Sequence, residues 1–429
     1  MTQNAYDVLR DRGFIQQCTD EEEVREAFAK GPVSAYVGYD PTADSLHVGH
    51  LFTLMALMHL ERLGHRPIVV LGGGTAMVGD PSGKTDMRQM LSKEDIESNV
   101  EKFRGVMGRL LDFEGGQSLI VDNSEWLLEL NYIEFLRRVG RHFSVNRMLS
   151  AEAYKLRLER GLSFIEFNYQ ILQAYDFMEL NKRHGCTMQL GGDDQWGNIL
   201  AGVDLTRRLN RAQVYGLTFP LLMNAAGEKM GKTASGAVWL ESHRLKPYDY
   251  YQYWVNVHDD DVERLCGFFT FLPMEEIRKI SELEGAHLNS AKSILAYEAT
   301  ALVHGEEEAN KAHAAAQGAF GGREIPSQIL PSSTVPRKAK ADSEQIPTTS
   351  MAESAFEGDG IPLADLMLDI AMVDSKSAAR RLIKQGAVRT NDQKINEVNQ
   401  VLTSASFVDG TLLIRAGKKK FHRVVLLPN

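Results

Sequence analysis

The sequence predicts an α/β fold whose first domain is a doubly wound parallel sheet. Residues 33–39 are rich in Val and Tyr and have the character of a short strand, and residues 67–71 form a second apolar run. Between them, residues 46–63 are mostly apolar at helical spacing. A strand, a buried helix and a second strand make most of a βαβ unit. Such units assemble into a parallel sheet with helices on its faces.

Composition divides the chain of 429 residues into four parts, and its 43% hydrophobic content is enough for two or three folded domains. The alternating strands and helices belong to residues 1–228, with an insertion at about 120–160. A Gly-rich loop with two lysines and then polar helices occupy 229–324. Four prolines among Ser, Thr and Ala predict a linker at 325–359. The last part, 360–429, is predicted to be a small α+β domain.

The charge changes sign in the last part. From Gly360 onward there are 11 Lys and Arg against 6 Asp and Glu, whereas the whole chain carries a net charge of −9. Lys376, Arg380, Arg381 and Lys384 recur along one predicted helix. A basic face on a small module favours binding to an RNA backbone, although a solvated helix face has the same pattern.

A pair of histidines, His47 and His50, lies at the start of the first long helix. Helix N-termini favour anions, because their first N–H groups lack helical partners and the macrodipole is positive there. Gly49 removes a side chain where an adenine or a ribose would lie against the backbone. Taken alone, such a pair is more often a helix cap or a surface feature than a catalytic one.

Two lysines, Lys229 and Lys232, lie in a Gly-rich stretch that has the composition of a mobile loop. Two ammonium groups on such a loop can close over a polyphosphate as point charges. A solvated basic loop is the alternative interpretation of the lysines alone. Together and in this order, the histidine and lysine motifs indicate one reaction, in which a carboxylate attacks the α-phosphate of ATP and pyrophosphate leaves.

The Gly-rich run at 72–84 is not a P-loop. Val78 stands where that motif needs its first glycine, and Pro81 lies inside the loop. Lys84 and Arg88, four residues apart, are either a surface pair or a third cationic contact for the phosphates.

A pocket for the second substrate is predicted on the next amphipathic segment. Ser163 and Glu166 form a capping box, so a helix is expected to begin at Ser163. Tyr169, Gln173 and Asp176 then share one face among apolar neighbours. Buried polar groups need partners, since an unpaired one costs roughly 2–7 kcal/mol. These side chains therefore belong either to a hydrogen-bonded core network or to a site for a ligand with a charged amine and a hydroxyl.

Residues 189–198 are a strand end that passes into a Gly-rich turn, and the carboxyl ends of strands are where doubly wound sheets bind ligands. Asp193 and Asp194 in this turn lack metal-ligand spacing, so one of them is expected to bind a ribose. Three scattered cysteines without a CxxC motif argue for a reducing cytosol and against a structural zinc, and no metal site is predicted. No apolar run has membrane length and the N-terminus is unlike a signal peptide, so we expect a cytoplasmic protein.

The sequence resembles the bacterial tyrosyl-tRNA synthetases, a family of class I aminoacyl-tRNA synthetases, over essentially its whole length. The most specific segments of the resemblance are residues 40–50, 79–82, 142–146 and 170–177. The resemblance implies a Rossmann-like catalytic domain, an α-helical anticodon-side domain and a small RNA-binding domain. It also implies that L-tyrosine is activated by ATP, with Mg²⁺, to tyrosyl-adenylate and is then transferred to tRNA.

The resemblance assigns roles to single residues. Those implied to bind tyrosine are Tyr36 and Asp176 at the phenol, Asp80, Tyr169 and Gln173 at the amino group, and Gln195 near the carboxylate. Those implied to bind ATP are Gly38, Asp40, Gly49, Gly192, Asp194 and Lys232. Those implied to surround the phosphates and to be catalytic are Thr42, His47, His50, Lys84, Arg88, Lys229 and Lys232.

The insertion is where relatives build a dimer interface, and its apolar residues exceed what a monomer surface should carry. These residues are Leu127, Leu128, Leu130, Ile133, Phe135 and Leu136. We therefore expect a symmetric homodimer.

No general base is needed for the first step, because an α-carboxyl titrates near ~3.5 and is ionised at neutral pH. Three alternatives share parts of this interpretation. A nucleotidyltransferase with an HxGH motif would lack the lysine loop and the RNA-binding module. A tryptophan-specific synthetase has the same fold and reaction but would not need a carboxylate opposite a phenol. A catalytically inactive RNA-binding relative would not need the intact histidine and lysine pairs.

Overall fold

The computed structural model of the protein describes residues 3–82, 91–150, 152–159, 161–233, 236–320, 324–338, 348–358, 360–391, 393–417 and 420–427. The chain forms two compact units. One comprises residues 1–309 with 326–335, and the other comprises 310–325 with 336–429.

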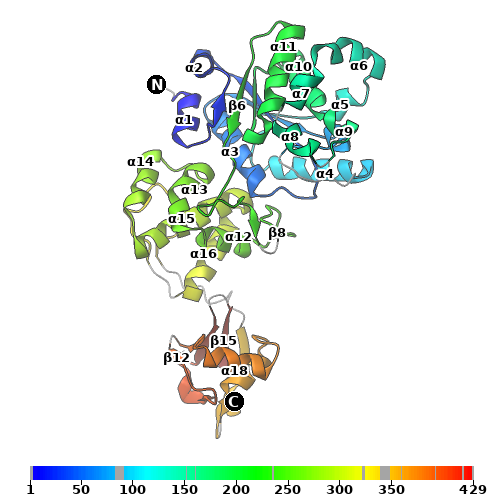
Figure 1. The fold of residues 1–429 in the computed structure, drawn as a ribbon. Coiled ribbons are helices and arrows are strands. Elements are labelled where there is room, and N and C mark those ends of the chain that lie inside the picture. Colours follow the sequence, from blue (N-terminus) through cyan, green and yellow to red (C-terminus); the bar gives the residue numbers. More distant parts are fainter. Residues whose placement is uncertain are drawn as a thin grey trace. The chain divides into compact units, whose positions relative to one another are not determined.

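The first unit begins at the N-terminus, which is blue in Figure 1. It is built on a six-stranded sheet with the order β1-β6-β5-β2-β3-β4. Its strands are β1 (Gln17–Cys18), β2 (Ser34–Tyr39), β3 (Arg66–Leu71), β4 (Leu119–Asp122), β5 (Met188–Gly192) and β6 (Tyr215–Phe219). Neighbours are parallel except for β1, which runs antiparallel to β6. The chain goes from β2 outward to β4 and then returns to β5 on the other side of β2. The α/β fold predicted from the sequence is confirmed, and its switch point lies between β2 and β5.

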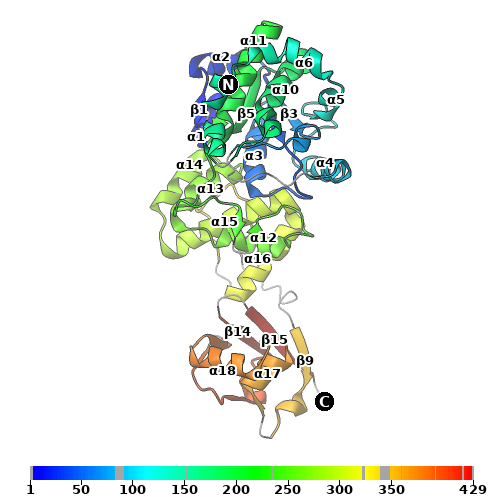
Figure 2. The ribbon, with the colours of Figure 1, turned by 45° about the vertical axis from the view of Figure 1, so that its right-hand side comes forward.

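Helices surround this sheet (Figure 2). The longer ones are α1 (Ala5–Asp11), α2 (Glu21–Lys30), α3 (Val48–Arg62), α4 (Lys93–Met107), α10 (Tyr169–His184) and α11 (Trp196–Asn210). The insertion holds α5 (Ser124–Leu127), α6 (Tyr132–Arg138), α7 (Val145–Leu149) and α8 (Glu152–Leu158).

The helix predicted to begin at Ser163 is in fact two helices. Ser163 caps α9 (Phe164–Phe167) in a capping box with Glu166, as predicted, but α9 ends at Asn168 and α10 begins at the next residue. The Asn168 side chain donates to the Phe164 carbonyl at 2.6 Å and so competes with the backbone bond that would continue the helix.

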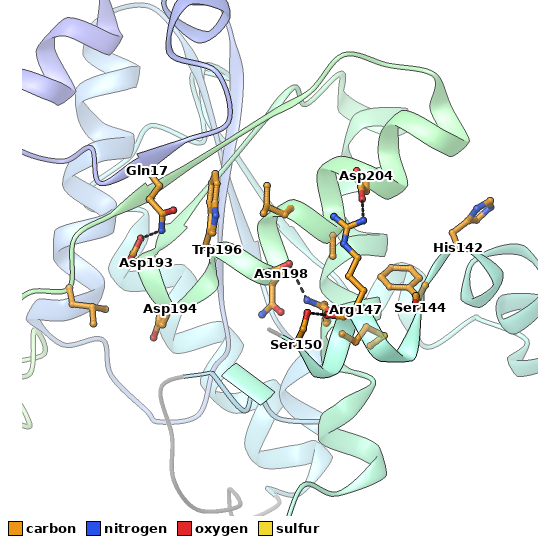
Figure 3. A pocket seen from close by; sticks show the side chains of 17 residues that line it. Gln17, His142, Ser144, Arg147, Ser150, Asp193, Asp194, Trp196, Asn198 and Asp204 are labelled. Carbon is orange, nitrogen blue, oxygen red and sulfur yellow. Dashed lines mark hydrogen bonds and ion pairs between the residues drawn. The ribbon is translucent and has the colours of Figure 1, made fainter. Parts of the chain in front are cut away.

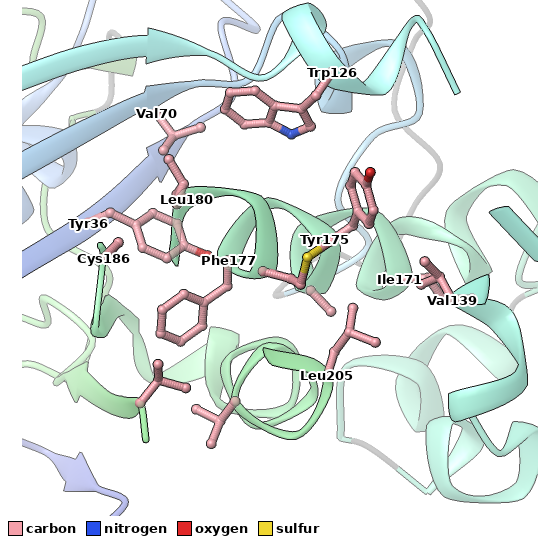
Figure 4. Packing of buried hydrophobic residues seen from close by; sticks show 14 of the residues in the cluster. Tyr36, Val70, Trp126, Val139, Ile171, Tyr175, Phe177, Leu180, Cys186 and Leu205 are labelled. Carbon is pink, nitrogen blue, oxygen red and sulfur yellow. The ribbon is translucent and has the colours of Figure 1, made fainter. Parts of the chain in front are cut away.

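An apolar cluster fixes α10 and α11 against the sheet (Figure 4). Tyr36 on β2 and Phe177 on α10 lie with ring centroids 5.3 Å apart, and Leu205 on α11 belongs to the same cluster. Close packing of this kind leaves α10 little freedom to shift. It therefore fixes the direction in which the polar residues of α10 point.

After β6 the chain forms a small hairpin and then a set of helices. The hairpin strands are β7 (Lys232–Thr233) and β8 (Gly236–Ala237), so part of the predicted loop is strand. The Gly231 carbonyl accepts from the Val238 N–H at 2.8 Å and closes the hairpin, a contact that composition does not reveal. The helices are α12 (Pro247–Val255), α13 (Val262–Phe269), α14 (Met274–Ile277), α15 (Gly285–His304) and α16 (Glu306–Phe320).

The range 325–359, predicted as a linker, contains packed and paired segments. Ile329, Leu330 and Val335 are buried, and the Ser333 hydroxyl donates to Glu298 at 2.6 Å. Residues Thr348–Ala352 form β9, which pairs parallel with a strand of the C-terminal sheet. Prolines exclude a helix, but extended segments between prolines can still pack and can pair at a sheet edge.

The second unit has its own sheet, with the order β12-β11-β14-β15-β9. Its strands are β9, β11 (Val388–Thr390), β12 (Gln393–Ile395), β14 (Thr411–Ala416) and β15 (Lys420–Leu427), and β10 (Ile361–Pro362) pairs with β13 (Val401–Leu402). Helices α17 (Leu363–Asp369) and α18 (Lys376–Lys384) pack on an apolar core. On α18, Ala379 and Ile383 are buried while Lys376, Arg380, Arg381 and Lys384 are exposed.

Candidate active site

A cavity of about 650 Å³ lies at the carboxyl ends of β2 and β5. It is lined by every residue with a described side chain, and by every described glycine, that the sequence assigned to tyrosine, ATP or phosphate: Tyr36, Gly38, Asp40, Thr42, His47, Gly49, His50, Asp80, Tyr169, Gln173, Asp176, Gly192, Asp194, Gln195 and Lys229. The backbone of Lys232 begins β7. Lys84 and Arg88 lie outside the described residues.

The two histidines form a stacked pair at the start of α3. Their ring centroids are 3.9 Å apart, and His47 is the N-cap of the helix. His47 Nδ1 accepts from the Gly49 N–H at 3.0 Å, and His50 Nδ1 accepts from the His47 N–H at 3.1 Å. A backbone N–H can only donate, so both Nδ1 atoms carry lone pairs and each neutral ring holds its proton on Nε2. The pair therefore caps the helix through Nδ1 and carries N–H groups on Nε2. It can be a helix cap and a donor to an anion at the same time.

Gly49 is required by the histidine itself. A Cβ at this position would lie 2.8 Å from His47 Cε1, closer than carbon atoms approach. The sequence explained this glycine by a nucleotide lying against the backbone. The structure gives a reason within the protein, because the cap brings the imidazole onto this residue.

Asp176 lines the cavity and is buried. It accepts from Asn123 Nδ2 at 2.9 Å and from Trp126 Nε1 at 2.7 Å. Burial raises the pKa of Asp176 to about 7, against the lowering effect of these two hydrogen bonds. Tyr36 is also buried, and among the described residues its hydroxyl has no hydrogen-bond partner. The Asp176 carboxylate and the Tyr36 phenol, whose hydroxyl lacks a hydrogen-bond partner among the described residues, thus line the same cavity.

Asp40 links Tyr169 to Thr75 along the lining of the cavity. The Tyr169 hydroxyl donates to Asp40 Oδ2 at 2.9 Å, and the Thr75 hydroxyl donates to Asp40 Oδ1 at 2.7 Å. Asn123 donates in turn to Thr75 at 2.9 Å. A continuous hydrogen-bonded chain therefore runs from Asp176 through Asn123 and Thr75 to Asp40.

A second network holds the side chains assigned to the amino and carboxylate groups. Gln195 Nε2 donates to Asp80 Oδ2 at 2.7 Å. Asn198 Nδ2 lies 3.0 Å from both Gln173 Oε1 and Gln195 Oε1. Asp194 stands nearby, and its pKa is raised by burial and by the negative charge of Asp80 and lowered by Lys229. This side of the cavity is therefore acidic and suits a cationic amine.

Sequence reasoning missed Asn123, Trp126, Thr75 and Asn198. Asn123 directly follows β4, so its place at the carboxyl end of a strand was a usable signal. It was overlooked because the surrounding residues were assigned to an insertion. Asn198 lies three residues after Gln195, but no local pattern separates it from the rest of α11.

The adjacent Asp193 has a structural role. Its Oδ1 accepts from Gln17 Nε2 at 2.7 Å (Figure 3). It also accepts from the Thr218 hydroxyl at 2.9 Å, and the two bonds tie β1 and β6 to the turn after β5. It borders a second cavity of about 560 Å³. Arg147 reaches Asp204 at 2.6 Å on the far side of that cavity.

Comparisons with known proteins agree with this architecture. Residues 29–321 match the family model described as tRNA synthetases class I (W and Y), and residues 340–424 match that of the tyrosine–tRNA ligase SYY-like C-terminal domain. The chain is 52% identical to a tyrosine–tRNA ligase of Clostridium botulinum over 99% of both chains. The chain belongs to the tyrosine–tRNA ligase family.

Further relatives extend this result. A tyrosine–tRNA ligase of Desulfosudis oleivorans is 51% identical over 98% of both chains. The crystal structure of a C-terminally truncated mitochondrial tyrosyl-tRNA synthetase from Aspergillus nidulans superposes with a TM-score of 0.66 at 31% identity, covering 73% of this chain and 94% of that one. The recognition made from the sequence is confirmed, and the tryptophan-specific and inactive alternatives are not favoured.

Proposed function

We propose that this chain activates L-tyrosine with ATP to form tyrosyl-adenylate and then transfers the tyrosyl group to tRNA. The observation that carries the proposal is that a single cavity is lined both by a buried carboxylate and phenol, Asp176 and Tyr36, and by the stacked histidines and Lys229. The carboxylate and phenol fit the side chain of tyrosine, and the histidines and the lysine fit a polyphosphate.

The phenol of tyrosine binds between Tyr36 and Asp176. Its oxygen accepts a hydrogen bond from the buried Tyr36 hydroxyl, and its O–H donates a hydrogen bond to the Asp176 carboxylate. Phenylalanine would leave both groups desolvated without partners, at a cost of about 1–3 kcal/mol for each neutral group and more for a charged one. Trp126 and Asn123 hold Asp176 in place, so the acceptor does not turn away from an incoming phenol.

The amino group of tyrosine binds at the acidic side of the cavity, near Asp80 and Gln173, and its carboxylate lies near Gln195. Tyr169 was assigned to the amino group together with these residues. Its hydroxyl donates to Asp40, so we propose that it presents its oxygen lone pairs to the ammonium. Gly38, Gly49, Gly192 and Asp194 border the space for the ribose and adenine.

In the activation step, a carboxylate oxygen of tyrosine forms a bond to the α-phosphorus of MgATP, and the bond to the bridging oxygen of pyrophosphate breaks. The Nε2–H groups of His47 and His50 donate to the phosphate oxygens as charge moves onto the leaving group. Thr42, Lys84, Arg88, Lys229 and Lys232 complete the phosphate site. Mg²⁺ arrives with ATP as part of the substrate, because it is held largely by phosphates and water.

Further proposals concern the parts of the chain outside this cavity. The four-part division of the chain stands as a proposal, except that β9 belongs with the C-terminal sheet. The exposed basic side chains of α18 bind tRNA phosphates. In the described parts of the chain no helix has the length and apolar character to cross a membrane, and we propose a cytoplasmic location.

We also propose that the chain is a homodimer. Leu128, Ile133 and Leu136 of the insertion are exposed, which a partner subunit would explain. The other three leucine and phenylalanine residues expected at this interface, Leu127, Leu130 and Phe135, instead pack against the apolar cluster under α10.

The experiment that tests the activity is amino-acid-dependent exchange of pyrophosphate into ATP. L-tyrosine is expected to support exchange, while L-tryptophan and L-phenylalanine support almost none. An Asp176→Asn variant is the control for the pocket, and it is expected to lose exchange with tyrosine. Exchange driven by tryptophan, or no exchange with any amino acid, would contradict the proposal.

A further inference from the structure

The segment that follows the lysine hairpin is bound directly to the start of α3. Residues 238–240 and 46–48 form an antiparallel bridge in which Trp239 lies opposite His47. Two backbone hydrogen bonds, each 2.9 Å long, join these segments on either side of the bridge. The lysine motif and the histidine motif are therefore held together by main chain as well as by a shared ligand site.

The side chains repeat this connection. The rings of Trp239 and His47 lie with centroids 6.1 Å apart and their planes inclined at 56°. His50 stacks on His47 at 3.9 Å. The first histidine is thus contacted by two aromatic rings, and its own Nδ1 is held by the Gly49 N–H.

Arg244 contacts the indole of Trp239 and is itself held by Asp44. Its guanidinium lies over the Trp239 ring, 5.0 Å from the centroid. It also donates from Nε to Asp44 Oδ1 at 2.7 Å, in the turn that leads into α3. The ion pair with Arg244 lowers the pKa of the Asp44 carboxyl. The four side chains Asp44, Arg244, Trp239 and His47 thus form a closed loop that begins and ends within four residues of the α3 N-terminus.

We propose that Trp239 and Arg244 are positioning residues for His47 in the formation of tyrosyl-adenylate. The inference rests on the proposed role of His47 as a donor to the phosphates. The Gly49 N–H fixes the Nδ1 edge of the imidazole, and the rings of His50 and Trp239 limit how far it can tilt. The indole restricts that tilt, and the paired arginine restricts the indole. The direction of the His47 Nε2–H bond matters most when charge has moved onto the pyrophosphate. Loss of the positioning contacts should therefore destabilise the transition state more than the bound substrates.

This role differs from a general contribution to folding. The Arg244 side chain is 42% exposed and Trp239 is only half buried, so neither belongs to the apolar core. Loss of their contacts should leave the tyrosine pocket unchanged, because Asp176 is held by Asn123 and Trp126, and Tyr36 packs against Phe177.

The test is the single-turnover rate of tyrosyl-adenylate formation, measured together with tyrosine affinity. Trp239→Leu is expected to lower the rate about tenfold with tyrosine affinity unchanged, since about 1.4 kcal/mol of transition-state stabilisation is lost. Trp239→Phe keeps an aromatic face and is expected to retain most of the rate. Arg244→Gln should lower it several-fold. Arg25→Gln removes another exposed arginine that pairs with an aspartate, Asp7, and is the matched control without effect.

A double-mutant cycle with His47→Asn separates positioning from structure. Asparagine keeps an acceptor for the Gly49 N–H but lacks the distal donor. In that background, Trp239→Leu is expected to change the rate by less than about twofold. A full tenfold loss there, or a loss of tyrosine affinity in the single variant, would overturn the inference. An unchanged rate in His47→Asn alone would instead refute the proposed role of the histidine.

Discussion

Tyrosine binding is expected to weaken in mild acid because of Asp176. The folded-state pKa of this carboxyl is raised from 3.8 to about 7 by burial. The phenol O–H of tyrosine donates a hydrogen bond to the ionised form of Asp176, so the affinity for tyrosine follows the ionised fraction of this carboxyl. That fraction is roughly nine-tenths near pH 8 and about 3% near pH 5.5 for a pKa of about 7, which predicts a roughly 30-fold loss of affinity. Affinity is therefore retained above the folded-state pKa and lost below it.

The assay is equilibrium binding of L-tyrosine to the intact protein across this pH range. Two comparisons isolate the carboxyl. Asp176→Asn should bind tyrosine weakly but without an acid limb, because its amide does not titrate. L-phenylalanine should bind weakly to the native protein and should not weaken further in acid, because it has no hydroxyl to donate. A flat profile for tyrosine on the native protein, or the same acid limb in the Asn variant, would refute the reasoning.

Three other predictions follow from the proposed roles and one from packing. Lys232→Ala should lower the rate of adenylate formation far more than tyrosine affinity, as stopped-flow kinetics and equilibrium binding would measure, and the opposite pattern would contradict a role in the transition state. Truncation after Lys338, ahead of β9, should leave pyrophosphate exchange nearly intact while tRNA charging falls and the salt dependence of tRNA binding becomes shallower; equal loss of both half-reactions would argue against an RNA clamp. Ile133→Asp should convert the proposed dimer to monomers in sedimentation, and an unchanged dimer would place the interface elsewhere. Arg157→Met should lower the free energy of unfolding, measured by urea denaturation, by about 3–5 kcal/mol, because the buried Glu166 carboxylate loses the guanidinium 3.0 Å away. Adding Glu166→Gln should recover much of that loss. No recovery would mean that Arg157 stabilises the protein by packing alone.

The sequence by itself indicated three of the groups that line the cavity, although not Thr75 and Asn123. The histidines at a helix start, the polar face of α10 and the Gly-rich turn after β5 each depend on neighbours within a few positions. Their placement then follows from the rule that a doubly wound sheet gathers its strand ends at one edge. The resemblance to the synthetase family assigned roles to these residues, and those roles remain proposals.

The tertiary structure decided how these residues are held. Asn123 and Trp126 bind Asp176 from about 50 positions away, and Trp239 reaches His47 across nearly 200. The pairing of β9 with β15 likewise joins segments far apart in the sequence, and composition had indicated a linker there. Hydrogen bonds and ring contacts of this kind depend on which surfaces the fold brings together. The local pattern of apolar and polar residues does not specify which distant surfaces will meet. These contacts are therefore known only from the packed structure.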